Sequence, residues 1–95
     1  MAIADFPHRH ACRIVADYVR HCPKIYLDPE KMHHYKWGLN EAWRLLKSDP
    51  EPPIKILERE QLKFDSWAHS GKPTDYIFGI VATAYDDLIN LLLTS

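Results

Sequence analysis

Glycine is scarce in this chain, which contains only three among 95 residues. Single glycines at positions 38, 71 and 79 cannot form the glycine-rich loop that binds phosphate groups in many nucleotide-binding folds, so those folds are excluded. The sequence also lacks any alternation of polar and apolar residues longer than a few positions, which argues against a β-rich fold.

Cysteine is equally scarce, with Cys12 and Cys22 as the only two. They lie ten positions apart in a segment with helical spacing, so about 15 Å would separate them and they cannot pair. We therefore expect free thiols, a reducing compartment and a cytoplasmic protein. His8 and Cys12 share a helix face, but two ligands do not make a zinc site. No metal and no cofactor is predicted.

Long apolar runs and a strong net charge are both absent. The most apolar stretch, YIFGIVATAYDDLINLLL, is interrupted by Asp86 and Asp87, so we expect it to be buried in protein and predict no membrane association. Positions 1–48 carry eight Lys and Arg against five Asp and Glu, a charge of +3, whereas positions 49–95 carry four against eight, a charge of −4. This balance makes nucleic acid an unlikely partner.

What the chain does contain is apolar residues at helical spacing, in segments whose starts and ends are marked by capping residues and prolines. Asp5 and Pro7 are suited to the start of a first helix, and Asp28 followed by Pro29 forms a well-defined start for a second. The prolines of SDPEPP separate the second helix from the third. The predicted helices cover approximately residues 7–22, 29–48, 53–70 and 74–93.

The end of the third helix is predicted from Gly71, which suits the left-handed position after a helix, and from Pro73, which prevents continuation. Thr74 and Asp75 then begin the fourth helix. Connections this short favour antiparallel neighbours. The sequence therefore predicts one domain over residues 1–95, an all-α four-helix bundle that is mostly antiparallel with short loops.

Trp37 lies on the wrong side of the second helix to join the core. The apolar stripe of that helix lies almost opposite it and consists of Met32, Tyr35, Leu39, Ala42, Trp43 and Leu46. Either the chain covers Trp37 itself, with the N-terminal AIADF or with KIY, or another molecule does. The residues grouped with it as a candidate interaction surface are His33, Asn40 and Arg44, with a row of arginines on the first helix, Arg9, Arg13 and Arg20.

Acidic residues offer an alternative site on the last two helices, composed of Glu58, Glu60, Asp86 and Asp87. Carboxylates on facing helices can hold Mg²⁺ for phosphate chemistry. This pattern resembles the paired acidic helices of the all-α nucleotide pyrophosphohydrolases, which carry ExxE followed by ExxD. Only Glu58 and Asp87 match, because Gln61 and Ala84 occupy the other positions.

The favoured interpretation is a small interaction or regulatory module without catalytic activity. An exposed Trp among polar residues is typical of a surface that binds another protein. The apolar stripe of the fourth helix is wide enough to suggest a second copy of the chain as partner, which predicts a homodimer. A Mg²⁺-dependent enzyme that resembles the pyrophosphohydrolases is the alternative.

Overall fold

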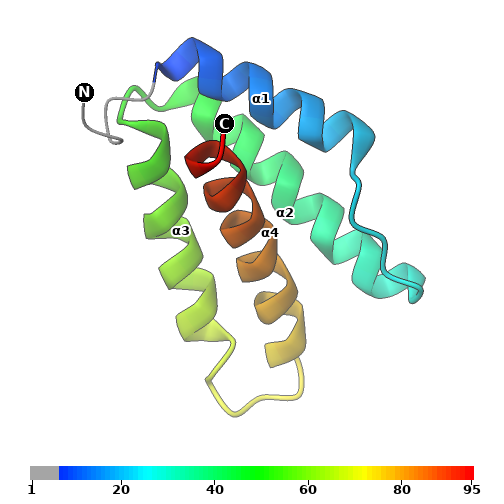
Figure 1. Ribbon diagram of the computed structural model, residues 1–95. Coiled ribbons are helices and arrows are strands. Elements are labelled where there is room, and N and C mark those ends of the chain that lie inside the picture. Colours follow the sequence, from blue (N-terminus) through cyan, green and yellow to red (C-terminus); the bar gives the residue numbers. More distant parts are fainter. Residues whose placement is uncertain (1–6) are drawn as a thin grey trace.

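Four helices make up the computed structural model, which describes residues 7–95 and has no strand within that range. Figure 1 shows two helical hairpins, α1 with α2 and α3 with α4, that meet through α2 and α4. The all-α four-helix fold predicted from the sequence is confirmed. The helices are α1 His8–His21, α2 Pro29–Ser48, α3 Pro53–Trp67 and α4 Asp75–Leu93.

The start of α2 follows the predicted signal. Asp28 precedes the helix in an extended conformation, and its carboxylate accepts a hydrogen bond of 2.9 Å from the backbone N–H of Glu30. Pro29 occupies the first helical position, where its missing N–H costs nothing. The proposed cap at Asp5 lies outside the described residues.

The predicted end of α3 was wrong by three residues. The helix ends at Trp67 and the chain turns before Gly71, whose φ is +84°. The reason is Asp75, whose carboxylate accepts hydrogen bonds from the Ser70 hydroxyl at 2.5 Å and from the Gly71 N–H at 2.7 Å. These bonds stabilise a turn over the residues where the helix was expected to continue.

The core is built mainly around α4, which lies against both α2 and α3. By length and composition alone α4 could cross a membrane, but the central helix of a soluble bundle passes the same test. Eight of its residues are buried, more than in any other helix. They are Ile80, Val81, Ala82, Ala84, Tyr85, Leu88, Ile89 and Leu92.

The approach of α2 to α4 depends on Gly38. A Cβ atom at this position would lie 2.9 Å from the Cβ of Ala84 and 3.4 Å from the Cα of Val81. The first distance is shorter than those between Cβ atoms that do not clash, so the helices would have to move apart, whereas the second is an ordinary van der Waals contact. Only glycine permits this spacing between the two helices.

A polar network joins α2 to α1 and α4 through Tyr35, one turn of α2 before Gly38. The buried Tyr35 hydroxyl donates a hydrogen bond of 2.6 Å to the Asp87 carboxylate, so the Tyr18 hydroxyl must donate the 2.9 Å bond that links it to Tyr35. The ammonium group of Lys24, from the α1–α2 linker, lies 2.9 Å from the same Asp87 oxygen. One carboxylate therefore connects α4, α2 and the linker.

Substitution of Gly38 tests the close approach of α2 and α4. Ala is a better helix former than Gly by about 1 kcal/mol, but here its methyl group would push α2 from α4. We expect Gly38→Ala to lower the free energy of unfolding by about 1–2 kcal/mol, measured by urea denaturation. Gly79→Ala is the matched control, because its nearest neighbour would be the Cβ of Ala68 at 3.9 Å. It should stabilise the protein, and an equal loss in both variants would contradict the account.

High pH tests the polar network. Burial, followed by the bond to Asp87, raises the pKa of Tyr35, and the bond to Asp87 raises the pKa of Lys24. Both groups keep their protons in the folded protein above the pH at which the unfolded chain loses them, so the stability they provide falls as pH rises beyond about 10.

The stability of the Tyr35→Phe variant should decrease less at high pH than that of the wild type. Between pH 10 and 11 the Tyr35 contribution to the free energy of unfolding drops by about 1 kcal/mol in the wild type, and Tyr35→Phe loses correspondingly less. Tyr26→Phe is the control, because no hydrogen bond of its hydroxyl is recorded in the described part of the chain. Identical pH profiles for Tyr35→Phe and wild type would contradict the role of the network.

Candidate interaction surface

Aromatic rings from three helices form one continuous surface, which we call the aromatic face: Trp37 of α2, Phe64 and Trp67 of α3, and Phe78 of α4. The ring centroid of Phe64 lies 6.2 Å from that of Trp37 and 5.4 Å from that of Trp67, both nearly perpendicular. Trp67 in turn meets Phe78 edge-on at 5.5 Å. These are the separations and angles at which aromatic pairs attract.

Phe64 anchors this face to the core. It is only 6% exposed and stacks on the buried ring of Tyr85 with centroids 5.6 Å apart. Trp37 and Trp67 lie on either side of it and remain 47% and 46% exposed. Trp37 is therefore covered on one side by α3, whereas the ring of Tyr26, from KIY, contacts Tyr35 instead.

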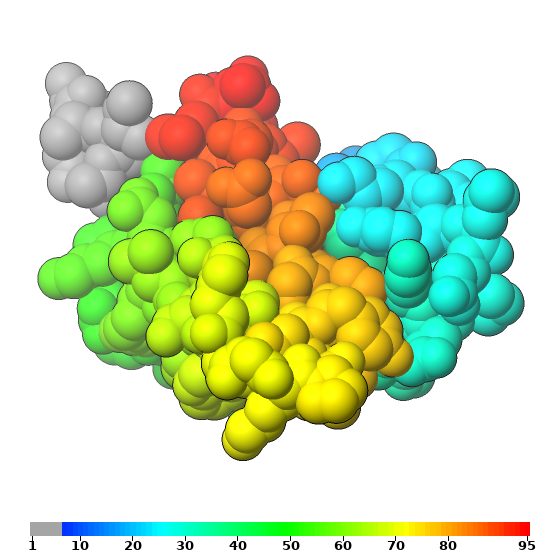
Figure 2. Space-filling view, turned by 90° about the horizontal axis from the view of Figure 1, so that it is seen from below, coloured from blue at the N-terminus to red at the C-terminus, as the bar shows by residue number. Residues whose placement is uncertain are grey.

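Two hollows open beside the exposed indoles, and Phe78 lines both. The larger has a volume of about 330 Å³ and includes Trp67 and Lys72, near the α3–α4 loop that is seen end-on in Figure 2. The smaller has a volume of about 220 Å³. Its lining residues are His33, His34, Trp37, Phe64, Ile77, Phe78 and Val81.

Hydrogen bonds fix one edge of the aromatic face. The hydroxyl of Tyr76, at the start of α4, donates a bond of 2.6 Å to the carboxylate of Glu30, at the start of α2. This bond holds the pKa of Glu30 below its usual value and raises the pKa of Tyr76. The ring of His34 lies edge-on to Tyr76, with centroids 6.4 Å apart. The beginnings of α2 and α4 are thus joined beside the smaller hollow.

Charged pairs lie next to Tyr85. Glu60 accepts a bond of 2.7 Å from Lys63, and Glu41 pairs with Arg44. The bond to Arg44 lowers the pKa of Glu41, whereas burial and then the negative charge of Glu60 raise the pKa of Tyr85. The ammonium group of Lys63, which pairs with Glu60, also lies 5.1 Å from the centre of the Phe64 ring.

The predicted interaction residues do not form one surface. His33 and Trp37 line the same hollow, but Asn40 lines a different groove between α1 and α2, together with Arg20. Arg13 lines a third depression, on the other side of α1. The two remaining predicted members are both exposed, Arg9 near the start of α1 and Arg44 in its pair with Glu41.

The acidic residues of the alternative site have separate partners. Asp87 belongs to the Tyr35 network, Glu60 pairs with Lys63, and Asp86 lies 3.5 Å from the side chain of Asn90. Glu58 is exposed. Over residues 7–95, no three His, Cys, Asp or Glu side chains are grouped so that they could hold a metal ion.

Sequence reasoning missed three members of the aromatic face. Phe64, Trp67 and Phe78 all have positions compatible with an ordinary apolar stripe, so their helical spacing predicts burial and not a shared surface. The available signal was the density of aromatic residues near the α3–α4 turn, where Trp67 and Tyr76 flank a segment with five polar residues and a proline.

Comparison with known proteins places this chain in no family: no protein-family model, no curated protein and no solved structure matches it.

Proposed function

We propose that this chain is a small non-catalytic module that binds another protein through the aromatic face, and that its first partner is a second copy of itself. The observation that carries the proposal is the pair of half-exposed indoles, Trp37 and Trp67, fixed on either side of the buried Phe64 ring. Tryptophan is among the residues that contribute most to the free energy of protein association.

The shape of the aromatic face supports self-association. Each exposed indole lies next to an apolar hollow, so a twofold arrangement lets the indole of one copy enter the hollow of the other. Such an interface is closed, because the same surface serves both copies. The indoles are also held by ring contacts before binding, which reduces the conformational entropy lost on association.

The polar surroundings fit a protein partner better than a nucleic acid. The charged side chains nearest Phe64 and Tyr85 form pairs of opposite sign, Glu41 with Arg44 and Glu60 with Lys63. A surface that binds nucleic acid needs an excess of cations along a phosphate backbone. Both cysteines are free, which supports a cytoplasmic or other reducing location for the proposed complex.

Light scattering coupled to size exclusion tests self-association directly. Wild type should show a mass that approaches twice the chain's 11.1 kDa as concentration rises. Trp37→Ala and Trp67→Ala should each weaken the dimer by about 30-fold, since truncation of a central aromatic residue costs about 2 kcal/mol. Leu62→Ala is the control, because Leu62 is 65% exposed but does not belong to the aromatic face. It should dimerise as wild type does.

A wild type that stays monomeric at all concentrations would contradict self-association. The remaining part of the proposal is then tested by capture of partners on immobilised protein. Partners retained by wild type and by Leu62→Ala should be lost from the Trp37→Ala/Trp67→Ala double variant. Circular dichroism must show that all variants remain folded. If the double variant retains the same partners as wild type, the aromatic face is not the binding surface.

A further inference from the structure

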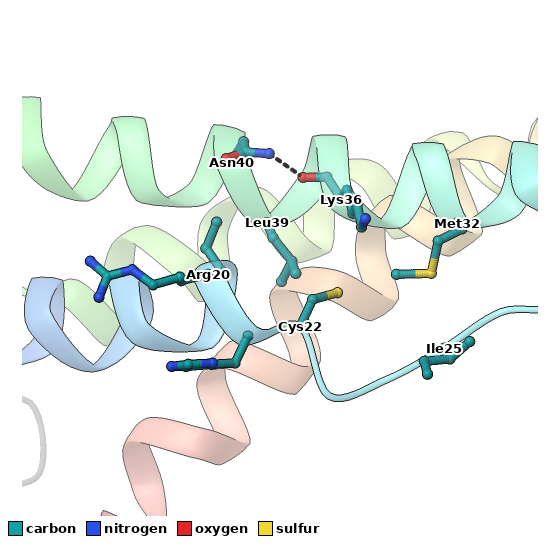
Figure 3. A pocket seen from close by; sticks show the side chains of 9 residues that line it. Arg20, Cys22, Ile25, Met32, Lys36, Leu39 and Asn40 are labelled. Carbon is teal, nitrogen blue, oxygen red and sulfur yellow. Dashed lines mark hydrogen bonds between the residues drawn. The ribbon is translucent and has the colours of Figure 1, made fainter.

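A second concave surface lies on the other side of α2, between the end of α1, the α1–α2 linker and α2 itself. This groove has a volume of about 460 Å³, within the range of small-molecule sites. In Figure 3 the side chains of Met32 and Leu39, from α2, and of Cys22, just after the end of α1, converge on it, and Ile25 lies on the linker at its edge. Val19 completes its apolar surface.

The linker itself is unusual for a short connection. Ile25 is 78% exposed. The residues on either side of it are nevertheless held in place: Lys24 forms an ion pair with Asp87, and the backbone N–H of Tyr26 donates a hydrogen bond of 3.3 Å to the Met32 sulfur. A fixed segment therefore presents an apolar side chain to solvent at the edge of an apolar groove. An apolar ligand in the groove would cover part of the Ile25 side chain.

The ionisable side chains that line the groove from α1 and α2 are mainly basic, and one of them, His21, lies 3.3 Å from the carboxylate of Asp17. Lys36 and Arg20 line it together with His21 and Asn40, and no Asp or Glu does so. Neither Lys36 nor Arg20 has an ion-pair partner among residues 7–95, in contrast to Arg44, Arg59 and Lys63, which all do. Lys36 projects from α2 beside the apolar floor, whereas Arg20 leaves the end of α1 with its guanidinium pointing away from that floor (Figure 3). Unpaired cations beside an apolar floor favour an anionic ligand with an apolar body.

The chemistry of the groove narrows the class of anion. The end of α1 that borders it carries the negative pole of the helix dipole, and the basic residues Arg20 and His21 lie in its last turn. A phosphate with two charges would be disfavoured there, whereas a single carboxylate can be held by Lys36, on α2, away from that end. The only aromatic ring in the lining is that of His21, so the groove has no platform on which a nucleobase would stack.

We propose that the α1–α2 groove binds a small amphiphilic carboxylate, with the chain on Val19, Met32 and Leu39 and the carboxylate at Lys36. Ile25 then closes over the bound chain from the linker. The site is separate from the aromatic face, and this proposal does not depend on dimer formation.

Titration with decanoate below its micellar concentration tests the site. In ¹³C-methyl spectra of the full chain, the signals of Val19, Ile25 and Met32 should shift together and saturate. Decanol, which has the same chain without the charge, should bind at least tenfold more weakly. Decyltrimethylammonium, with the opposite charge, should not shift these signals at the same concentration.

Charge reversal at Lys36 provides the decisive variant. Lys36→Glu should weaken decanoate binding at least tenfold, and Ile25→Asp should weaken it through the apolar contact; both positions are exposed, so the fold should survive. Lys55→Glu, at an exposed lysine on α3, is the matched control and should bind as wild type does. Shifts that do not saturate, that fall outside the groove, or that are the same in Lys36→Glu and Lys55→Glu would overturn the proposal.

Vesicles that contain phosphatidylglycerol distinguish a free ligand from a lipid surface. The proposal expects saturable decanoate binding in solution and no Lys36-dependent binding to these vesicles. If the protein binds the vesicles through Lys36 but does not bind free decanoate, the groove is part of a membrane-surface contact and the proposed ligand class is wrong.

Discussion

The contact between α2 and α4 at Gly38 determines how the two helical hairpins are placed. A Cβ atom there would meet Ala84 at 2.9 Å, so the helices can approach this closely only because residue 38 has none. The short distance lets the rest of α2 pack its apolar stripe against α4, with Tyr35 buried deeply enough to bond Asp87. The Tyr35 network and the core therefore both depend on the close approach of α2 to α4 at Gly38.

Because α4 occupies one side of α2 and α1 occupies another, the remaining parts of α2 are only partly covered. On one of them α3 reaches Trp37 through the single ring of Phe64, which leaves the indole half exposed. On another, α1 ends and its linker leaves a groove beside Lys36. Both proposed binding surfaces thus arise because α2 packs against α1 in one hairpin and against α4 in the other, and neither contact covers it completely.

Much of the fold could be predicted from the sequence, because prolines and Asp28 mark helix starts and the spacing of apolar residues is helical. The end of α3 could not, since the side chain of Asp75 stabilises the preceding turn and such a bond leaves no trace in local propensity. The position of Trp37 opposite the stripe predicts that its side chain lies outside the core, and it is 47% exposed. The other members of the aromatic face could not be found, because Phe64 and Trp67 become neighbours of Trp37 only when α3 packs against α2.

A double-mutant cycle between positions 38 and 84 tests the central claim, that close contact of α2 with α4 at these two residues determines the arrangement. Urea denaturation of wild type, Gly38→Ala, Ala84→Gly and the double variant gives the coupling free energy. Removal of the opposing methyl group should relieve the clash, so the double variant should be more stable than the sum of the single effects by about 1 kcal/mol or more. Effects that add to within about 0.5 kcal/mol would show that the two positions do not meet and would contradict the account.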